Sequence, residues 1–321
     1  MVQIEHLEFI RISKGFVNKP FEVTNAWVEY QKVRGSNVLF FVDSKEQPQI
    51  LSWAKIKKVK FIGEVLEIQG PIYKETVSTK QLFKFLNALK DLPFKGVFLN
   101  LSTVYNVEFE VACRKAQFKR PIGQSSTNLT IVVDTSEFSP DRNWRRNVKS
   151  ANEENFKFEV KQDASINDCE VIEKLHVENS KIKKLSYTLV SSQIKSLTEQ
   201  DNIYVCFLYK NETPIAARII SIEESISYDV FASNSLESRN NGATQFFMQS
   251  IFDYLKSIEI YKFDFSRIPL GRKGAKGVYE FKNATRGQVI QYNGEWVFFK
   301  NKKLRHLYYL YNAIINKKDF Y

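Results

Sequence analysis

The first half of the chain alternates short apolar runs with polar turns, the pattern of β-strands joined by short loops. An amphipathic stretch at 25–33 precedes three closely spaced runs that predict a meander of strands, at 37–43, 47–56 and 60–71. A helix over 78–92 is predicted next, because four apolar side chains recur at helical spacing after a Ser and a Thr: Leu82, Phe85, Leu86 and Leu89. Runs at 96–103 and 128–136 predict further strands, and 107–120 fits a short helix or a strand.

The second half repeats this order. Segments 165–180 and 186–197 predict helices, and three apolar runs between 203 and 233 predict strands separated by polar turns. A strong helix is predicted at 238–258, where seven side chains mark one face: Phe246, Phe247, Ser250, Ile251, Tyr254, Leu255 and Ile258. A short strand is expected at 261–266.

Two further features close the chain. Asn293-Gly294, within the segment 288–300, predicts the turn of a hairpin. In the tail, 300–321, five side chains fall on one helical face: Leu304, Leu307, Tyr308, Tyr311 and Ile315. We expect a closing helix that packs on the second half. The alternative is a basic, aromatic surface for RNA or an anionic membrane.

A polar and charged segment, 138–162, lies between the halves and is predicted to be a linking helix. The boundary expected near residue 150 gives a first domain over 1–150 and a second over 151–321. Strands, helix, strand and closing elements occur twice in similar order, so the predicted fold class is α+β with a duplicated plan.

The composition is that of a folded protein with excess positive charge. Of 321 residues, 43% are hydrophobic, enough for a core in each of two domains. Forty-seven Lys and Arg against 36 Asp and Glu leave a net charge of +11, which favours anionic partners. A solvated basic surface explains the same charge equally well. No run approaches the length of a transmembrane segment, and the N-terminus lacks a continuous apolar core, so we expect a cytoplasmic protein.

Residues that commonly carry covalent or metal chemistry are few and scattered. The three cysteines are widely spaced and form no CxxC pair, so buried thiols are expected. The three histidines lie far apart, without the spacing of a Ser/His/Asp or Cys/His site, and metal-binding patterns are absent. We therefore expect no metal and no tightly bound cofactor.

One candidate site is the start of the strong helix, in the sequence SRNNGATQFF. Backbone N–H groups at a helix N-terminus, with Gly242 allowing close approach and Arg239 adding charge, can bind a phosphate. Capping of the helix by Asn240 or Asn241 is the alternative explanation.

A second candidate is the segment DFSRIPLGRKGAKGVYEFKNATRG, from Asp264 to Gly287, which holds six basic side chains and four glycines. It fits neither the P-loop pattern nor the dinucleotide GxGxxG spacing, so nucleotide hydrolysis is not expected. A Gly-rich loop after a strand and before a helix more often binds than packs.

Three motifs in order along the chain resemble one family. Gly70-Pro71, in EIQGPIY, matches a strand-end Gly-Pro. The link WRRNVKSANEENFKFEV resembles R-x-I-R-K-A-x-K-x-G-V, with four positions in register: Arg146, Val148, Lys149 and Ala151. FDFSR followed by VYEFKNATRG is similar to DFGG or DFGR followed by G-x-x-x-FK-x-x-F/W-G, with Thr285 where an aromatic is usual. The chain thus resembles the FemABX-like transferases.

The resemblance implies two GNAT-like domains, each a mixed, mostly antiparallel sheet flanked by helices. It also implies acyl or aminoacyl transfer to an amine of a cell-envelope or polysaccharide precursor, with an anionic donor, aminoacyl-tRNA or acyl-CoA, as co-substrate. In such a reaction the amine attacks an ester or thioester carbonyl, loses a proton, and a negative oxygen is stabilised. tRNA and an anionic membrane surface are further partners to consider.

The resemblance also assigns roles to residues. Lys282 is the expected oxyanion stabiliser, Phe281 would position it, and Asp264 would accept or orient a proton unless it only caps the strand end. Donor or phosphate binding is expected at Arg239, Asn240, Asn241, Gly242, Ala243 and Arg267. Substrate contacts are expected at Ser266, Tyr279, Thr285, Arg286 and Arg146.

Two alternatives stay open. RNNGAT comes near the coenzyme-A pattern R-x-x-G-x-G/A, with Thr244 at its last position, whereas the net charge favours RNA, so either donor is compatible with the sequence. A hypothesis of another class is a non-catalytic protein of GNAT fold that binds RNA or a polyanionic glycan. It predicts salt-sensitive association and no acyl product.

Overall fold

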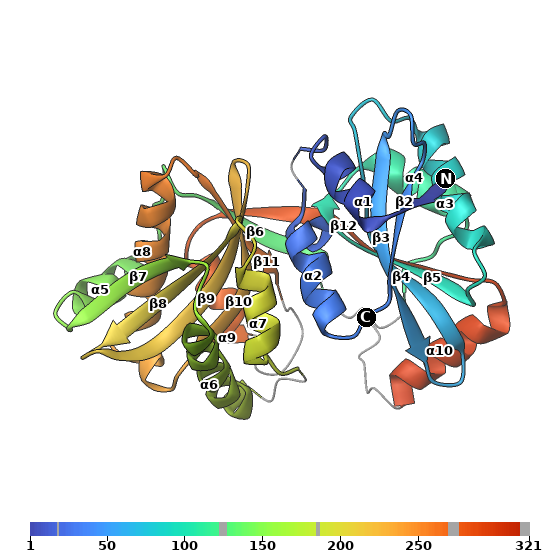
Figure 1. Ribbon diagram of the computed structural model, residues 1–321. Helices are drawn as coiled ribbons and strands as arrows, with labels where there is room; N and C mark the ends of the chain where they lie inside the picture. The colour runs from blue at the N-terminus through green and yellow to red at the C-terminus, as the bar shows by residue number, and fades with distance from the viewer. Residues whose placement is uncertain (18, 122–126, 184–186, 269–275, 315–321) are drawn as a thin grey trace. The chain divides into compact units, whose positions relative to one another are not determined.

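The computed structural model describes residues 1–17, 19–121, 127–183, 187–268 and 276–314 (Figure 1). The chain divides into two compact units, each of which contains its own sheet. Unit 1 comprises Met1–Leu129 and Gln291–Tyr321, and unit 2 comprises Thr130–Ile290. This division differs from the single boundary expected near residue 150, because the end of the chain returns to unit 1.

Unit 1 is a six-stranded mixed sheet with helices on its two faces. Its elements are β1 (Val2–Ile4), α1 (His6–Ser13), the 3-10 turn η1 (Phe21–Val23), α2 (Asn25–Val33), β2 (Val38–Val42), β3 (Ile50–Val59), β4 (Gly63–Tyr73), α3 (Thr79–Asp91), β5 (Gly96–Val104), α4 (Val107–Lys115), β12 (Gln288–Phe299) and α10 (Lys302–Ile314). The strand order is β1-β2-β3-β4-β5-β12, and only β4 and β5 run parallel.

Helix α3 forms where the sequence predicted it. The Ser78 side chain accepts a hydrogen bond from the backbone of Gln81, and the Gln81 side chain accepts one from the backbone N–H of Ser78, which is a capping box. The predicted apolar face is buried in the main core of unit 1, against α4 and the strands. The segment 107–120, for which a helix and a strand were both possible, begins with the helix α4, whose first turn is capped by Asn106.

The opposite face of this sheet is covered by α1, η1 and α2. Strand side chains alternate between faces, so Phe41 packs into the core with α3, while its neighbour Phe40 packs with Phe9 of α1 and Val28 of α2. Each fully buried side chain of this size contributes about 1.5–3 kcal/mol through removal of apolar surface from water.

The predicted hairpin at 288–300 is wrong. β12 runs straight through Asn293-Gly294 and pairs with β5, with a shift of register between Tyr292 and Gly294. The buried Asn293 side chain donates to Thr103 Oγ1 (2.9 Å) and to the carbonyl of Val104 (3.0 Å), and accepts from the N–H of Asn106 (2.9 Å). These tertiary bonds give Asn-Gly the role of a bulge rather than a turn.

The closing helix α10 packs on unit 1, so the expected packing on the second half is also wrong. Leu304 and Tyr308 contact a cluster from β3, β4, β5 and β12, and the Tyr308 ring lies 5.0 Å from that of Phe98 and 5.4 Å from that of Phe299. Ile315, the last residue of the predicted face, lies outside the described residues.

Unit 2 is a second six-stranded mixed sheet. Its elements are β6 (Leu129–Asp134), α5 (Arg142–Ala151), β7 (Phe156–Gln162), α6 (Ile166–Lys183), α7 (Ser191–Thr198), β8 (Ile203–Lys210), β9 (Thr213–Glu223), β10 (Ile226–Asn234), the 3-10 turn η2 (Glu237–Arg239), α8 (Ala243–Ser257), β11 (Lys262–Arg267) and α9 (Lys276–Asn283). The order is β6-β11-β10-β9-β8-β7, and only β10 and β11 run parallel.

The linking segment 138–162 is not one helix. α5 ends at Ala151, and the following FKFEVKQ forms β7, which pairs with β8 over its whole length. Alternation of Phe156, Phe158 and Val160 is the period-2 signal for this strand, and its charged neighbours obscured it.

The buried face of α8 is rotated from the predicted one. Phe247, Ile251 and Leu255 are buried as expected, but the other buried side chains are Ala243, Met248 and Phe252. Phe252 contacts the rings of Phe263 and Phe265 on β11 and that of Phe138 before α5. Helix α8 therefore packs against this segment as well as the sheet, and its buried stripe is broader than predicted.

The two units share one element order, namely a strand, two helices, three strands, a helix, a strand and a helix. The strand after the last of these helices pairs in the other unit. β6 follows α4 but pairs with β11 in unit 2, and β12 follows α9 but pairs with β5 in unit 1. This exchange explains why no single cut divides the chain. Among the described residues, no helix is long and apolar enough to span a bilayer.

Candidate functional site

The end of β11 in unit 2 is held by the buried ammonium of Lys282. This lysine lies on α9 and is 8% exposed. Its Nζ donates to the carbonyls of Phe265 (2.6 Å), Arg267 (3.1 Å) and Ser266 (3.3 Å). Charge-assisted bonds of this kind are the stronger ones in proteins, so the ammonium fixes three successive peptide groups where the strand ends.

Asp264 is buried on the same strand and is also hydrogen-bonded. Its Oδ1 accepts from the hydroxyl of Thr130 on β6 at 2.5 Å and from the N–H of Ser266 at 2.7 Å. Ser266 has a φ of 56°, a left-handed conformation that bends the strand end around the carboxylate. The structure thus brings together the predicted residues Asp264, Ser266, Arg267 and Lys282.

Beside this strand end, the parallel strands β10 and β11 separate. They are in register only between Ile226–Tyr228 and Lys262–Asp264, and β10 carries a bulge between Asp229 and Phe231. The Ser266 hydroxyl donates to the carbonyl of Asp229 at 2.7 Å and bridges the two strands. In open sheets, the carboxyl ends of neighbouring parallel strands are a common position for ligands.

A buried ion pair lies at the bulge. Arg218 of β9 donates from Nη1 to Oδ2 of Asp229, and the two side chains are only 6% and 11% exposed. Within the described part of the chain, Arg218 Nε and Asp229 Oδ1 are buried without a hydrogen-bond partner. Sequence reasoning missed this pair, although an Arg within the apolar run PIAARIIS was a signal for it.

Cys206 faces Arg218 on the neighbouring strand. Burial raises the pKa of its thiol far above the usual range, so it stays protonated. All three cysteines are free and buried, as expected.

The predicted phosphate loop before α8 makes mostly structural contacts. Gly242 has a φ of 72°, and a Cβ at this position would overlap the carbonyl of Asn147 on α5. Arg239 is exposed and donates to Oδ1 of Asn179 at 3.0 Å, and Asn241 donates to Glu154 at 2.5 Å. The glycine therefore allows close helix packing. Asn240 is exposed and Ala243 is buried at the first position of the helix, which has no side-chain cap.

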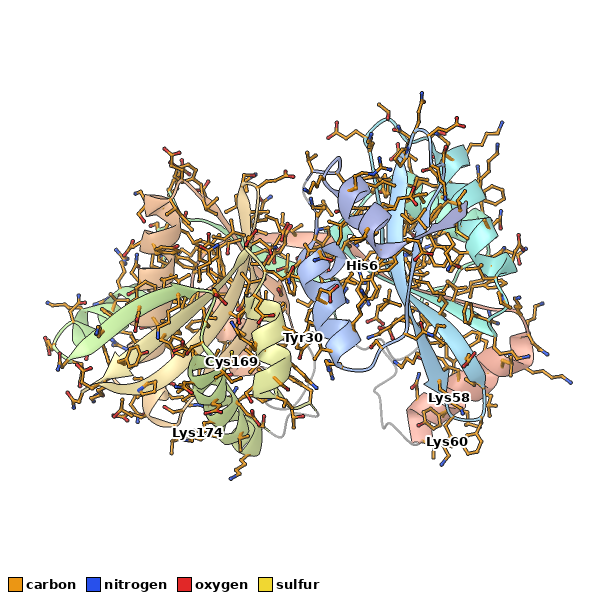
Figure 2. All side chains as sticks on the ribbon, in the orientation of Figure 1. His6, Tyr30, Lys58, Lys60, Cys169 and Lys174 are labelled. Carbon is orange, nitrogen blue, oxygen red and sulfur yellow. The ribbon has the colours of Figure 1, made fainter. Side chains whose placement is uncertain are left out.

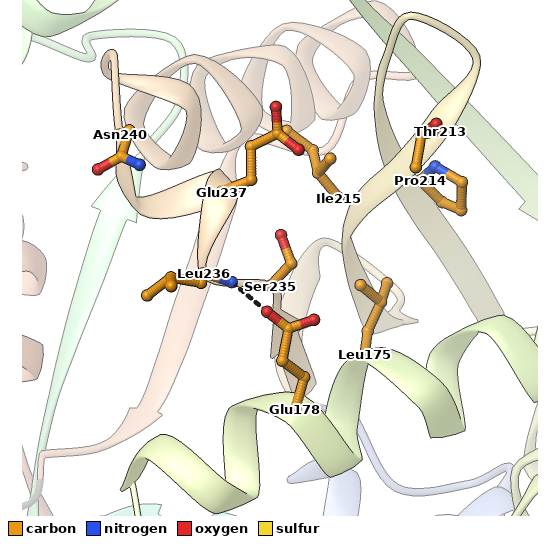
Figure 3. A pocket seen from close by; sticks show the side chains of 9 residues that line it. All are labelled: Leu175, Glu178, Thr213, Pro214, Ile215, Ser235, Leu236, Glu237 and Asn240. Atoms are coloured by element: carbon orange, nitrogen blue, oxygen red, sulfur yellow. Dashed lines mark hydrogen bonds between the residues drawn. The ribbon is translucent and has the colours of Figure 1, made fainter.

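A cavity of about 470 Å³ opens beside this loop (Figure 3). It is lined by Leu175, Glu178, Thr213, Pro214, Ile215, Ser235, Leu236, Glu237 and Asn240. Glu178 accepts a hydrogen bond from the backbone N–H of Leu236 at 2.6 Å, and Glu237 lies near Lys210. Two carboxylates on its wall make this cavity a poor match for a phosphate.

A second cavity, of about 540 Å³, lies between α5, α9 and the start of α8. It is lined by Asp141, Asn143, Trp144, Asn147, Gln245, Gly277, Glu280, Phe281, Asn283 and Ala284. The Phe281 ring lies 5.0 Å from Trp144 and 6.3 Å from Phe265, so it joins the cavity wall to the aromatic core under β11. Trp144 Nε1 is a buried donor that has no partner among the described groups.

Thr285 and Arg286 line a third cavity, of about 390 Å³, next to β6. The Thr285 hydroxyl donates to the carbonyl of Lys282 at 2.5 Å and lies 3.3 Å from the N–H of Gly287, so Thr285 closes the end of α9. Tyr279 is half-buried on α9, and Arg146 is exposed on α5 outside all three cavities. In the described ranges, no cluster of three His, Cys, Asp or Glu side chains could hold a metal.

Thr130 is the residue of this site that sequence reasoning could not find. It lies far from Asp264 in sequence and reaches the carboxylate only because β6 pairs with β11. The segment 269–275, with most of the predicted Gly-rich loop, lies outside the described residues.

No protein-family model and no curated protein matches the sequence. Solved structures do match its fold, which is a tandem of GNAT-like units. FemX is similar at a TM-score of 0.75 with 13% identity, over 98% of this chain and 100% of that one. The C-terminal domain of a putative lysylphosphatidylglycerol synthetase from Agrobacterium fabrum gives a TM-score of 0.65 with 12% identity, over 97% of each chain.

A tandem GNAT protein from the clavulanic acid biosynthesis pathway is similar at a TM-score of 0.56 with 7% identity, over 92% of this chain and 94% of that one. The chain therefore has a FemX-like fold, α+β with two GNAT-like units, as the sequence motifs predicted.

Proposed function

We propose that this protein is an acyl or aminoacyl transferase that forms an amide on an amine of a cell-envelope or polysaccharide precursor. The observation that supports this most is the extent of the likeness to FemX, which covers both units and nearly all of each chain. A second similar structure is described as part of a putative lysylphosphatidylglycerol synthetase, so an aminoacyl donor is the first choice. Acyl-CoA is the second.

The proposed reaction centre is the end of β11. The acceptor amine attacks the carbonyl carbon of the donor ester or thioester, a proton leaves the amine, and the tetrahedral intermediate expels the alcohol or thiol. Asp264 is the proposed group that orients or accepts this proton, directly or through Thr130, whose hydroxyl lies 2.5 Å from its carboxylate.

Lys282 is proposed to act first as a positioning residue. Its three ammonium hydrogens are matched by three backbone carbonyls, so direct contact with an oxyanion requires it to release at least one of them. The result of this arrangement is a fixed positive charge at the strand end, which stabilises a negative oxygen nearby.

The proposal is tested by incubating the protein with amine-bearing cell-envelope precursors and either charged tRNA or acetyl-coenzyme A. Mass spectrometry should detect a new amide with one of the donors. Salt-sensitive RNA or glycan binding, with no amide from either donor across the acceptor panel, would support the non-catalytic alternative instead.

Lys282→Met is the variant that tests the assigned centre. We expect a loss of transfer of at least about 100-fold, which is the scale of the effect when reacting groups are misplaced by about 1 Å. We also expect the free energy of unfolding to fall by about 2–3 kcal/mol, because three carbonyls lose their donor. Urea unfolding and initial rates measure the two effects.

Lys256→Met is the matched control, since Lys256 is exposed on α8. It should change neither quantity measurably. A folded Lys282→Met protein that transfers at the parent rate would remove Lys282 from the reaction centre.

A further inference from the structure

Helix α10 carries a second apolar stripe that faces away from unit 1. Leu307, Leu310 and Ile314 are 36%, 56% and 61% exposed, whereas Leu304 and Tyr308 pack inward on the strands. Positions three and four apart are neighbours on a helix, so these three side chains form one continuous row. Exposed large apolar side chains in such a row mark an interaction surface more often than isolated ones do.

The loop between β3 and β4 extends this surface. Phe61, at its tip, is 68% exposed, and its ring lies 6.5 Å from that of Tyr311. Tyr311 follows Leu307 by four positions and precedes Ile314 by three, so it joins Phe61 to the outward row. We call the surface formed by Phe61, Leu307, Leu310, Tyr311 and Ile314 the apolar patch.

Lysines lie beside the apolar patch at the β3–β4 loop and at the start of α10. Lys60, labelled in Figure 2, lies with its Nζ 5.1 Å from the centre of the Phe61 ring, and Lys58 is exposed near the end of β3. Lys302 and Lys303 are exposed in the first turn of α10, and Lys303 falls four positions before Leu307 on the same row.

The nearby strands β3 and β4 carry two acidic side chains among the described residues. Glu64 stands opposite Lys58 across the strand pair, and Glu67 is occupied by ion pairs with Lys55 and Lys57. The surface therefore combines several exposed apolar side chains with a local excess of positive charge.

We propose that the apolar patch and its lysines dock unit 1 on an anionic lipid bilayer. An amphipathic helix with apolar residues on one side and Lys or Arg beside them lies in the plane of the bilayer interface, with its apolar side chains among the acyl chains. Phe61 and the outward row of α10 enter the interface, and the lysines contact the lipid phosphates. This docking does not rest on the proposed enzymatic function.

RNA is the other polyanion that the basic charge would suit, and the apolar row argues against it. Single strands stack on aromatic rings such as Phe61 and Tyr311, but Leu307, Leu310 and Ile314 would then stay exposed to water, whereas a bilayer buries them. The two partners also respond differently to substitution, because the neutral truncation Leu310→Ala/Ile314→Ala should weaken docking on lipid and leave RNA binding intact.

Co-sedimentation with vesicles of phosphatidylcholine alone, or with phosphatidylglycerol added, tests the proposal on the full chain. We expect binding that requires phosphatidylglycerol. Leu310→Glu/Ile314→Glu should weaken it at least about tenfold, since two apolar groups are replaced by charge. Lys60→Gln and Lys303→Gln should each weaken it about fivefold, as expected for one cation near an anionic surface.

Matched controls are Leu7→Glu, an 81% exposed leucine on α1, and Lys157→Gln, an exposed lysine in unit 2. Both should bind like the parent. If the Leu310→Glu/Ile314→Glu protein binds vesicles at parent strength, or if the parent binds RNA but not phosphatidylglycerol vesicles, the proposal is overturned.

A second readout does not depend on a loss of binding. The three native cysteines are buried, so Leu310→Cys can be labelled with an environment-sensitive fluorophore. Its emission should shift to the blue on phosphatidylglycerol vesicles, and label on Leu7→Cys should not shift. Equal spectra for the two labelled proteins would contradict insertion of the row.

Discussion

The two units repeat the same elements but differ where the parallel strand pair meets the next helix. In unit 1, α3 begins with the capping box of Ser78 and Gln81. In unit 2, α8 begins at Gly242 with no side-chain cap, and the end of β11 lies beside the buried side chains of Asp264 and Lys282. Buried charges cost free energy unless they are paired, and they concentrate at functional sites. The comparison therefore supports the proposal that the reaction centre lies in unit 2.

Breaking the ion pair of Arg218 and Asp229 should have the largest effect on stability. Asp229→Leu leaves a guanidinium buried without its partner, so the free energy of unfolding should fall by about 3–5 kcal/mol. The double variant Arg218→Met/Asp229→Leu should recover most of this loss, because no charge remains buried. Urea unfolding of the single and double variants measures the coupling.

In unit 1, the more exposed pair of Lys55 and Glu67 is the comparison, with side chains 25% and 15% exposed. Lys55→Met should lower the free energy of unfolding by less than Asp229→Leu does, since water partly screens this pair. Equal losses in the free energy of unfolding from the two variants would mean that deeper burial does not make the ion pair of unit 2 more costly to break.

The helix starts of the two units offer a smaller, matched test. Gly242→Ala places a Cβ against the carbonyl of Asn147 at a positive φ, and should cost about 2–3 kcal/mol. Ser78→Ala removes only a cap from α3, and should cost about 1 kcal/mol. Thermal unfolding measures both losses of stability. A Gly242→Ala protein as stable as the parent would show that α5 can move away from this contact without cost.

The smallest expected effect is a pH dependence in unit 1. Burial raises the pKa of Glu67, but Lys55 and Lys57 outweigh it and hold this pKa below its ordinary value. The stabilisation is therefore present above the ordinary Glu pKa and is lost as pH falls through the lower folded-state pKa. Glu67→Gln should flatten this part of the stability curve, measured by urea unfolding between about pH 3 and 7.

The spacing of apolar residues predicted single helices and strands well, but it predicted poorly which elements pack or pair with one another. The face of α3 and the three strands before α8 were predicted, because spacing of apolar residues reports which face a local element buries. β7 was missed, since its alternation is weak among charged residues, and Asn293-Gly294 was misread because tertiary hydrogen bonds override a turn preference.

The candidate site was predictable only in part. A motif located Asp264 and Lys282, and the structure brings them to one strand end. Thr130 carried no local signal, because its contact with Asp264 depends on β6 pairing in unit 2. Gly242 was expected to allow a phosphate to approach the helix, but it allows close approach of the α5 backbone instead. The local sequence around Gly242 cannot reveal this contact between two helices.

The sequence by itself determined two α+β repeats, their main helices and strands, and the motif at the end of β11, because these depend on contacts between residues close along the chain. Only the tertiary structure decided the exchange of β6 and β12, the return of α10 to unit 1, and the carbonyl partners of Lys282. These depend on pairing between distant segments, for which many partners have similar patterns and only packing selects one.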